Sequence, residues 1–386
     1  MDSILDQIRD LSQRSDEAGQ LRIQKALRDI QTELQSPKDL LMDLANSFVL
    51  IGTIRLGADL GLFRHFASQK EPLTVSQLAD LTGASPQLLE RFLRYLASTN
   101  IIKEVAANQY QANTTTFVLA DPKGDAMIYH GFDNHAPTVM AMPAFFAENN
   151  YQDIDSVLKT PFQKAHNTTL SSFEWYVKNP EHFENLQKVM TSLEGVEWTV
   201  GFNHFESEAK KIPSSLPVSS EKPFFVDVGG GHGHQCIQLG KKYPNLLGRL
   251  VLQDLPAAVN KLAPIEGVKA VAHDFFEEQP ITDAKFYYLR RIMHDWPDRE
   301  CSNILRNIAS AMSAESRILI DEVVLPDTGA HWQATMADIT MMIGLGGKER
   351  TAQQWQALAD LSGLQIELIH TYTASTYTSV IVMALK

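Results

Sequence analysis

A glycine-rich turn between an apolar segment and a helix-like segment constrains the fold of this chain more than any other feature. Residues 224–228 are apolar except for Asp227, and glycine then occupies positions 229, 231 and 233. Glycine permits a tight turn and lets a ligand reach backbone N–H groups that a Cβ would shield. The spacing, Asp-x-Gly-x-Gly-x-Gly, is neither the dinucleotide fingerprint nor a P-loop. We therefore predict a strand–turn–helix unit in which Asp227 holds the loop or accepts from a ligand.

A second carboxylate strengthens this prediction. Residues 250–253 read as the next strand, and Asp254 stands at its end. An acidic side chain at the end of the second strand of a doubly wound unit suits the hydroxyls of a ribose. The two features together predict a nucleoside-containing ligand. The alternative is a glycine-rich turn beside a surface aspartate.

The composition limits the class of partner and the compartment. The chain has 386 residues, 44% of them hydrophobic, and a formal net charge of −12. These values predict a substantial core and argue against nucleic acid as a partner, because phosphate binding needs a basic surface. Cys236 and Cys301 are the two cysteines, so we expect no disulfide framework and a cytoplasmic protein. The most apolar run, 44–54, is too short to span a bilayer, and no membrane partner is expected.

Residues 1–117 read as a mainly helical, winged-helix-like domain. Apolar positions at helical spacing predict two amphipathic helices within 4–35 and a longer apolar helical stretch over 39–65, buried on most sides. Residues 73–117 then follow the order helix, turn, helix and hairpin, beginning with a capping box at Thr74. Because the chain is acidic, we predict that this domain serves dimerisation and not DNA binding.

Residues 118–215 are predicted to form a helical connecting and substrate-pocket region, and 216–386 a nucleoside-binding domain. The first of these is rich in methionine and aromatic residues, which form ordinary core or line an apolar pocket. Residues 207–223 are interpreted as a linker. Beyond it, strands and helices alternate, which predicts an α/β, Rossmann-like doubly wound sheet. The strand candidates are 224–228, 249–253, 268–271, 285–289, 317–321, 365–370 and 378–384, and the short turn before the last one predicts an antiparallel hairpin.

Polar side chains follow several of these strands at the edge where doubly wound sheets bind ligands. Asp274 and Phe275 could bind an amino group and the face of a base. His294 follows the next strand, where a neutral imidazole could take a proton from a hydroxyl. Glu322 and Glu349 could both converge on His294 and orient it. The alternative for His294 is a structural histidine, and no His/Cys spacing suggests a metal site.

Five motifs, in their order along the chain, resemble those of the plant and fungal O-methyltransferases of small molecules. The resemblance is to the fungal secondary-metabolite branch in particular. The resemblance covers nearly the whole chain. The motifs are Asp227–Gly233, Leu252–Pro256, His273–Phe276, His294–Trp296 and Gly346–Thr351.

The resemblance implies S-adenosyl-L-methionine as cofactor and assigns roles to residues. Gly229, Gly231 and Gly233 would bind its methionine part. Asp254 would bind the ribose hydroxyls, and Asp274 with Phe275 would bind the adenine. Arg290 occupies a position near the adenine where plant members often have lysine. The set of cofactor-binding residues also includes Asp227 and Leu255. His294 would be the general base, oriented by Glu322 and Glu349. The predicted substrate-binding residues are Asp295, Met140, Phe173, Met190 and Met342.

Three functions follow from these features. The first is methylation of a hydroxyl of an aromatic or polyketide-type metabolite by a homodimer, without a metal. The second is a pericyclase or cyclase that keeps the cofactor without transferring its methyl group, as some fungal relatives do. The presence of His294, Glu322 and Glu349 favours methyl transfer. The third, a cofactor-sensing regulator that uses the winged helix, is disfavoured by the acidic composition.

Overall fold

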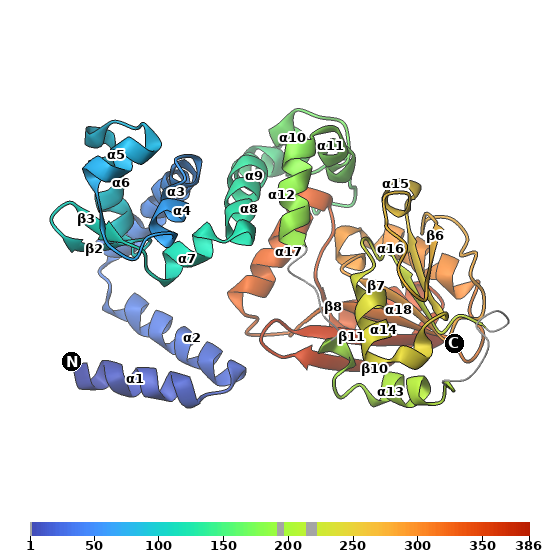
Figure 1. Ribbon diagram of the computed structural model, residues 1–386. Helices are drawn as coiled ribbons and strands as arrows, with labels where there is room; N and C mark the ends of the chain where they lie inside the picture. Colours follow the sequence, from blue (N-terminus) through green and yellow to red (C-terminus); the bar gives the residue numbers. More distant parts are fainter. Residues whose placement is uncertain (1, 191–196, 214–221) are drawn as a thin grey trace. The chain divides into compact units, whose positions relative to one another are not determined.

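The computed structural model describes residues 2–190, 197–213 and 222–386. It divides into two compact units, Met1–Ala141 with Phe173–Leu193, and Met142–Ser172 with Glu194–Lys386 (Figure 1). The segment 118–215, predicted to be a connecting region, is thus shared between the two units. The three-part division of the chain stays a prediction.

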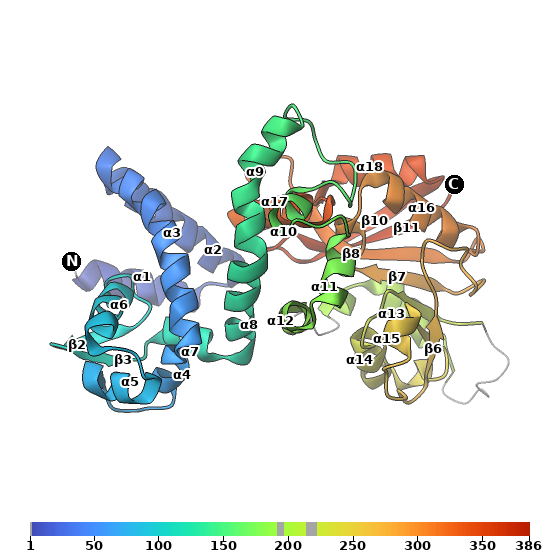
Figure 2. The same cartoon turned by 90° about the horizontal axis from the view of Figure 1, so that it is seen from above.

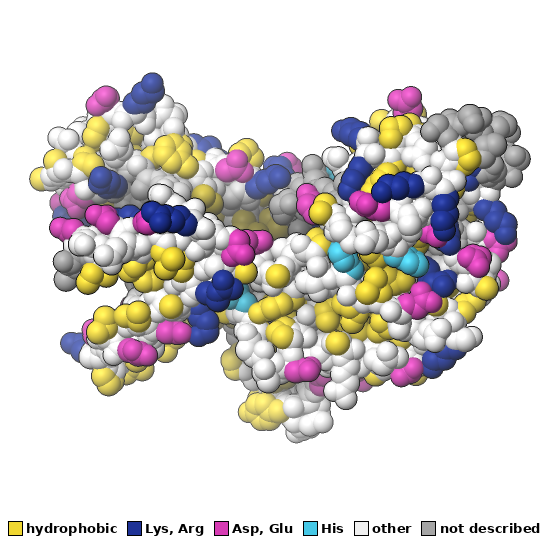
Figure 3. Space-filling model, turned by 90° about the horizontal axis from the view of Figure 1, so that it is seen from below, with side chains coloured by type: hydrophobic (Ala, Val, Ile, Leu, Met, Phe, Trp, Pro, Cys, Tyr) yellow, Lys and Arg dark blue, Asp and Glu magenta, His cyan; other side chains and the backbone are white. Residues whose placement is uncertain are grey.

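The first unit begins with the two helices that the sequence predicts. Helix α1 spans Asp2–Arg14 and α2 spans Glu17–Leu34, which is capped by Asp16. Neither helix buries an apolar side chain, and Leu34 is 81% exposed. On the face of the molecule shown in Figure 3, hydrophobic side chains lie among charged ones.

The apolar stretch 39–65 differs from its prediction. It forms two helices, α3 (Pro37–Asp59) and α4 (Leu62–Ala67), because the chain turns at Gly61 with a φ of 64°. The side chains of α4 are largely buried, whereas those of Leu41, Leu44 and Phe48 on α3 are 67–69% exposed. The expectation of burial on most sides was therefore wrong for α3, since none of the described residues of this unit covers these side chains. By length and composition α3 could also cross a membrane, although core helices meet the same criterion.

The winged-helix pattern is confirmed. Strand β1 (Leu73–Thr74) leads into α5 (Val75–Thr82) and α6 (Pro86–Ser98), and the hairpin of β2 (Lys103–Ala106) and β3 (Gln109–Gln111) follows. The three strands form one sheet in the order β1-β3-β2. Helices α7 (Thr114–Ala120) and α8 (Pro122–His130) continue into a π-helical turn, η1 (Gly131–His135), and into α9 (Ala136–Glu148). Helix α12 (Pro180–Met190) packs on α8.

The second unit is the predicted doubly wound sheet. Its strands lie in the order β10-β11-β8-β7-β4-β5-β6, and β10 and β11 form the expected antiparallel hairpin beside an otherwise parallel sheet. The strand bounds are β4 Phe225–Val228, β5 Leu250–Asp254, β6 Val268–Ala272, β7 Phe286–Arg290, β8 Arg317–Leu325, β10 Leu364–Thr373 and β11 Thr378–Leu385. A short strand, β9 (Arg350–Thr351), pairs with the end of β8.

Helices cover both faces of this sheet (Figure 2). On one face, α13 (Asn203–Lys210) and α14 (His234–Lys242) bury a core that includes Phe205 and Leu239. On the other, α16 (Asp298–Ala309) and α18 (Ala352–Leu361) bury Leu305 and Trp355. The linker expected over 207–223 was wrong for its first residues, which extend α13, and residues 214–221 lie outside the described part of the chain.

The described residues of this unit also form α10 (Pro161–His166), α15 (Pro256–Val259), α17 (Trp332–Leu345) and the 3-10 turns η3 (Glu197–Thr199), η4 (Pro244–Leu246) and η5 (Met293–Asp295). Helix α11 (Ser172–Lys178) begins in this unit and continues in the first.

Candidate active site

The glycine-rich loop joins β4 to α14 and leaves space beside its backbone. Gly231 and Gly233 have φ values of 56° and 78°, in the left-handed region that strains other residues. A Cβ on Gly233 would lie 2.6 Å from the side chain of Ile265, whereas one on Gly231 would meet nothing within 4 Å. A ligand can therefore approach the backbone at Gly231.

Asp227 lies under this loop, away from its open side. It is 2% exposed, and its Oδ2 lies 3.9 Å from Sγ of Cys236 and would lie 2.6 Å from a Cβ on Gly230. Burial, and then the charge of Asp254, raises the pKa of Asp227 to about 7. Of its two predicted roles, this position fits that of holding the loop.

The carboxylate of Asp254 at the end of β5 is oriented by two backbone groups. The N–H of Gly231 donates to Oδ2 at 2.8 Å, and that of Leu255 donates to Oδ1 at 2.7 Å. The side chain is half-buried, and each oxygen keeps a lone pair. A charged acceptor fixed next to the open side of Gly231 suits a pair of vicinal hydroxyls.

The remaining predicted cofactor residues divide into two groups. The ring of Phe275 would lie 3.8 Å from a Cβ on Gly229, so it flanks the loop, and the neighbouring Asp274 is exposed. Arg290 instead lies against a buried carboxylate, with its Nη1 3.4 Å from Oδ2 of Asp321. The structure thus brings Phe275 to the loop and places Arg290 in the polar interior of the sheet.

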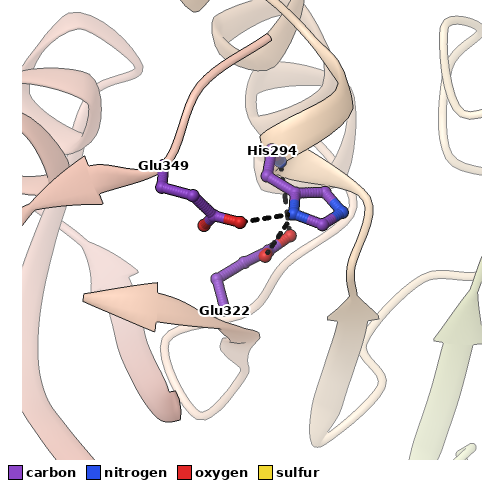
Figure 4. Close-up of side chains that lie close together, drawn as sticks. All are labelled: His294, Glu322 and Glu349. Carbon is purple, nitrogen blue, oxygen red and sulfur yellow. Dashed lines mark hydrogen bonds and ion pairs between the residues drawn. The ribbon is translucent and has the colours of Figure 1, made fainter. Parts of the chain in front are cut away.

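His294 sits in η5, directly after β7, and both predicted partners reach the same nitrogen of its ring (Figure 4). Its Nδ1 lies 2.9 Å from Oε1 of Glu349 and 3.6 Å from Oε2 of Glu322. Oε1 of Glu322 also accepts from the backbone N–H of Met293 at 3.0 Å and of His294 at 3.3 Å. Nδ1 therefore carries the hydrogen, and Nε2 points away from both glutamates (Figure 4).

The carboxylates around His294 favour its protonated form. Burial alone lowers its pKa, but Glu322, Asp295 and Glu349 outweigh burial and raise the pKa to about 9. Asp295 lies with Oδ1 3.4 Å from Nε2, and burial raises its own pKa to about 7. The carboxylates thus favour the imidazolium, and the neutral fraction of His294 grows as the pH rises towards 9.

Two arginines that the sequence reasoning did not single out frame this cluster. Arg350 is fully buried and donates to the backbone oxygens of Met293 and Trp296, both at 2.9 Å, so it clamps both ends of the turn that carries His294. Its position directly after Glu349, within the motif Gly346–Thr351, was the sequence signal that could have indicated a role for Arg350. A sequence does not show, however, which carbonyl groups a buried arginine faces.

The second is Arg291, which supplies positive charge to both glutamates. Its Nη1 lies 3.8 Å from Oε2 of Glu322 and 4.0 Å from Oε1 of Glu349. Its φ of 54° is a strained conformation for a residue with a side chain. Strain of this kind gathers at functional sites, and it has no signature in the sequence.

The three ligand atoms of His294, Glu322 and Glu349 lie within 4.8 Å of one another, which is close enough to hold a metal ion. Two oxygens, Oε2 of Glu322 and Oε2 of Glu349, are buried and accept no hydrogen bond from the described residues. The expectation that the site needs no metal stays a prediction.

The predicted substrate residues lie in different units. Asp295 adjoins His294, and Met342 lies in the last turn of α17, a helix that contacts η5. Met140 and Met190, 66% and 52% exposed, and the half-buried Phe173 belong to the first unit. The structure brings Asp295, and the helix that carries Met342, to the turn of His294, and the roles of all five residues stay predictions.

Comparisons with known proteins agree with this arrangement. Residues 152–365 match the family model for an O-methyltransferase domain, and residues 42–120 match that for an O-methyltransferase dimerisation domain. Two similar curated proteins come from Aspergillus flavus. The O-methyltransferase lepI is 39% identical over 98% of this chain and 97% of its own length, and a demethylsterigmatocystin 6-O-methyltransferase is 39% identical over 100% and 98%.

Solved structures show the same fold. The structure of LepI in complex with S-adenosylmethionine superimposes with a TM-score of 0.88 at 38% identity, covering 100% of this chain and 98% of LepI. A structure described as a pericyclic reaction enzyme matches with the same values.

Proposed function

The chain belongs to the O-methyltransferase family, and from this we propose that it transfers a methyl group from S-adenosyl-L-methionine to a hydroxyl of an aromatic or polyketide-type metabolite. One observation carries the proposal. Glu349 and Glu322 hold His294 by Nδ1, which leaves Nε2 of its neutral form directed away from them to receive a proton (Figure 4).

The loop residues fit the cofactor. The open side of Gly231 admits a ligand to the backbone, Asp254 presents an oriented carboxylate for ribose hydroxyls, and Phe275 offers a ring face beside Gly229. When bound, S-adenosylmethionine supplies an electrophilic methyl group on a sulfonium, which is already a good leaving group.

The protein then has two tasks, to position the substrate oxygen and to remove its proton. Positioning can supply about 7–11 kcal/mol in well-oriented model reactions. His294 takes the hydroxyl proton at Nε2 as the oxygen–methyl bond forms and the sulfur–methyl bond breaks. The charges of Glu322, Asp295 and Glu349 stabilise the imidazolium that results, as the raised pKa of His294 reflects.

The test is to express the chain in a fungal host with its neighbouring biosynthetic genes and to follow the product by mass spectrometry. We expect a product heavier than its precursor by one methylene unit, with S-adenosylhomocysteine formed in equal amount. Asp254→Ala should weaken binding of S-adenosylmethionine by about tenfold or more, because charged hydrogen bonds are the strong ones. Unchanged affinity by calorimetry would remove Asp254 from the site.

The second candidate is a pericyclase that keeps the cofactor intact. Two observations favour it, the similarity to a pericyclic reaction enzyme and the raised pKa that makes His294 a cation at neutral pH. A protonated His294 would donate from Nε2 to a substrate carbonyl and polarise it. S-adenosylmethionine recovered unchanged after many turnovers, with a product isomeric with its precursor, would replace the first proposal by this one.

The chain carries a dimerisation domain, and we propose a homodimer in the cytoplasm in which the N-terminal helices take part. The exposed apolar side chains of α3 support this, because a monomer would leave them in water. Phe48→Asp should yield monomer by light scattering, whereas Leu361→Asp, at an exposed apolar residue of the second unit, should leave the dimer intact.

A further inference from the structure

The first unit contains a second cluster of polar side chains that the proposed chemistry does not use. Asn134 in η1 is 2% exposed, and its amide lies between two histidines. Its Oδ1 lies 2.5 Å from Nδ1 of His182, and its Nδ2 lies 3.2 Å from Nδ1 of His130. His130 ends α8 and His182 belongs to α12, so the amide bridges two packed helices.

This arrangement fixes opposite tautomers in the two rings. The amide oxygen accepts, so Nδ1 of His182 carries a hydrogen and its Nε2 is an acceptor. The amide nitrogen donates, so Nδ1 of His130 accepts and its Nε2 carries the hydrogen. Reversing the amide exchanges the two roles but still leaves one donor and one acceptor. Neither Nε2 makes a hydrogen bond to another described residue, and neither is a buried atom lacking a partner.

The surroundings favour the neutral form of His130 and give the pair aromatic walls. Burial, with the nearby His135 and His182, lowers the pKa of His130 to about 4. The ring of Trp175 lies 5.0 Å from that of His182, and the ring of Tyr176 lies 6.1 Å from that of His130. The π-helical turn that carries Asn134 is a form of backbone that gathers at functional sites.

We propose that His130 and His182, held by Asn134, bind a neutral planar molecule that carries both a carbonyl and a hydroxyl oxygen. One ring donates from Nε2 to the carbonyl, and the other accepts at Nε2 from the hydroxyl. The inference rests on the proposed function, since it describes the class of metabolite that the enzyme modifies. Its test, however, needs no turnover.

The first arm of the test reads the tautomers directly. Long-range ¹⁵N–¹H spectra of the full-length chain labelled on histidine distinguish the two neutral forms from the cation, and His130→Gln and His182→Gln assign the signals. We expect both rings to be neutral at pH 7 and of opposite tautomer. The variant Asn134→Asp keeps the shape of the side chain but presents two acceptors, so both rings should then carry hydrogen on Nδ1 and become alike. Equal tautomers or a protonated ring in the wild type would overturn the proposal.

The second arm measures binding in the presence of S-adenosylhomocysteine, with 4-hydroxyacetophenone as the probe and 4-methoxyacetophenone, which cannot donate, as its match. The wild type should prefer the hydroxyl compound by about tenfold, the value of one hydrogen bond. Asn134→Asp leaves no Nε2–H to donate to the carbonyl that both probes share, so it should weaken both by about tenfold and keep the preference. His65→Gln, at a half-buried histidine elsewhere in the unit, should change neither affinity. Equal affinities in the wild type, or no binding of the probe, would count against the proposal. Methyl transfer, followed separately as S-adenosylhomocysteine formed, can stand or fall independently of these results.

Discussion

Two histidine clusters of this chain share a hydrogen-bonding arrangement but shift the pKa of their histidine in opposite directions. In each, a histidine is held at Nδ1 and keeps Nε2 for another partner. His294 meets the carboxylates of Glu322 and Glu349, and its pKa is raised to about 9. His130 meets the amide of Asn134 and two other histidines, and its pKa is lowered to about 4.

The comparison indicates that the charge of the neighbouring groups, and not burial, sets the direction in which the pKa of each histidine moves. Burial disfavours the cation in both clusters. Only carboxylates outweigh that effect, so His294 can hold a proton taken from a substrate, whereas His130 stays a neutral donor or acceptor. The first cluster is suited to chemistry and the second to recognition.

The largest expected effect separates these two roles. His294→Gln should lower turnover by roughly 10²–10⁴-fold with binding of S-adenosylmethionine nearly intact, because the general base is lost. His130→Gln should raise KM by about tenfold and change kcat little. Rates of S-adenosylhomocysteine formation measure both. Equal losses of kcat in the two variants would erase the distinction between the clusters.

Next in size is the dependence of the charged cluster on its clamp. Arg350→Met should lower the free energy of unfolding by about 1–3 kcal/mol for each carbonyl group that loses its donor, those of Met293 and Trp296. Asp298 keeps its pairing with Lys348. Denaturant unfolding measures this change, with Arg299→Met as the matched control. That arginine is 81% exposed and pairs with its neighbour Glu300, so its replacement should leave the free energy of unfolding nearly unchanged. A stable Arg350→Met protein with full turnover would show that η5 needs no clamp.

The pH profile tests the charge of His294 itself. If Nε2 must be neutral to accept a proton, kcat/KM should rise about tenfold for each pH unit below the pKa of about 9. Glu322 contributes most among the charges that raise the pKa of His294. Glu322→Gln should therefore move the rising limb of the kcat/KM profile to lower pH. Glu367→Gln, whose carboxylate pairs with Arg317, should leave the limb in place. A profile that falls with rising pH would instead favour the protonated His294 of the pericyclase proposal.

The smallest expected effect concerns metal. Prolonged treatment with a chelator should leave turnover unchanged, because Nδ1 of His294 and Oε1 of Glu349 already bond to each other at 2.9 Å. Atomic absorption of the purified protein is the companion measurement. Lost activity that zinc or magnesium restores would make the three side chains a metal site and overturn this expectation.

Much of the fold could be predicted from local sequence. The strand–turn–helix at 224–242, the capped helices of the winged-helix part and the antiparallel hairpin at the end depend on alternation, caps and turn length, which act between near neighbours. The convergence of Glu322 and Glu349 on His294 also followed, because each stands at a strand end or in a motif. The exposure of α3 did not, since an apolar helix reads the same whether its own chain or a partner covers it.

The sequence by itself determined which chemistry is present, namely the glycine loop, Asp254 and the histidine with its glutamates, because residue type and spacing along a strand edge are written in the chain. Only the tertiary structure decided which side chains meet across it. Arg290 lies against Asp321 instead of the loop, Arg350 clamps η5, and Asn134 joins two histidines 52 positions apart, His130 and His182. Such contacts form where packing brings distant elements together, and neither propensity nor periodicity records the direction in which a polar side chain finally points.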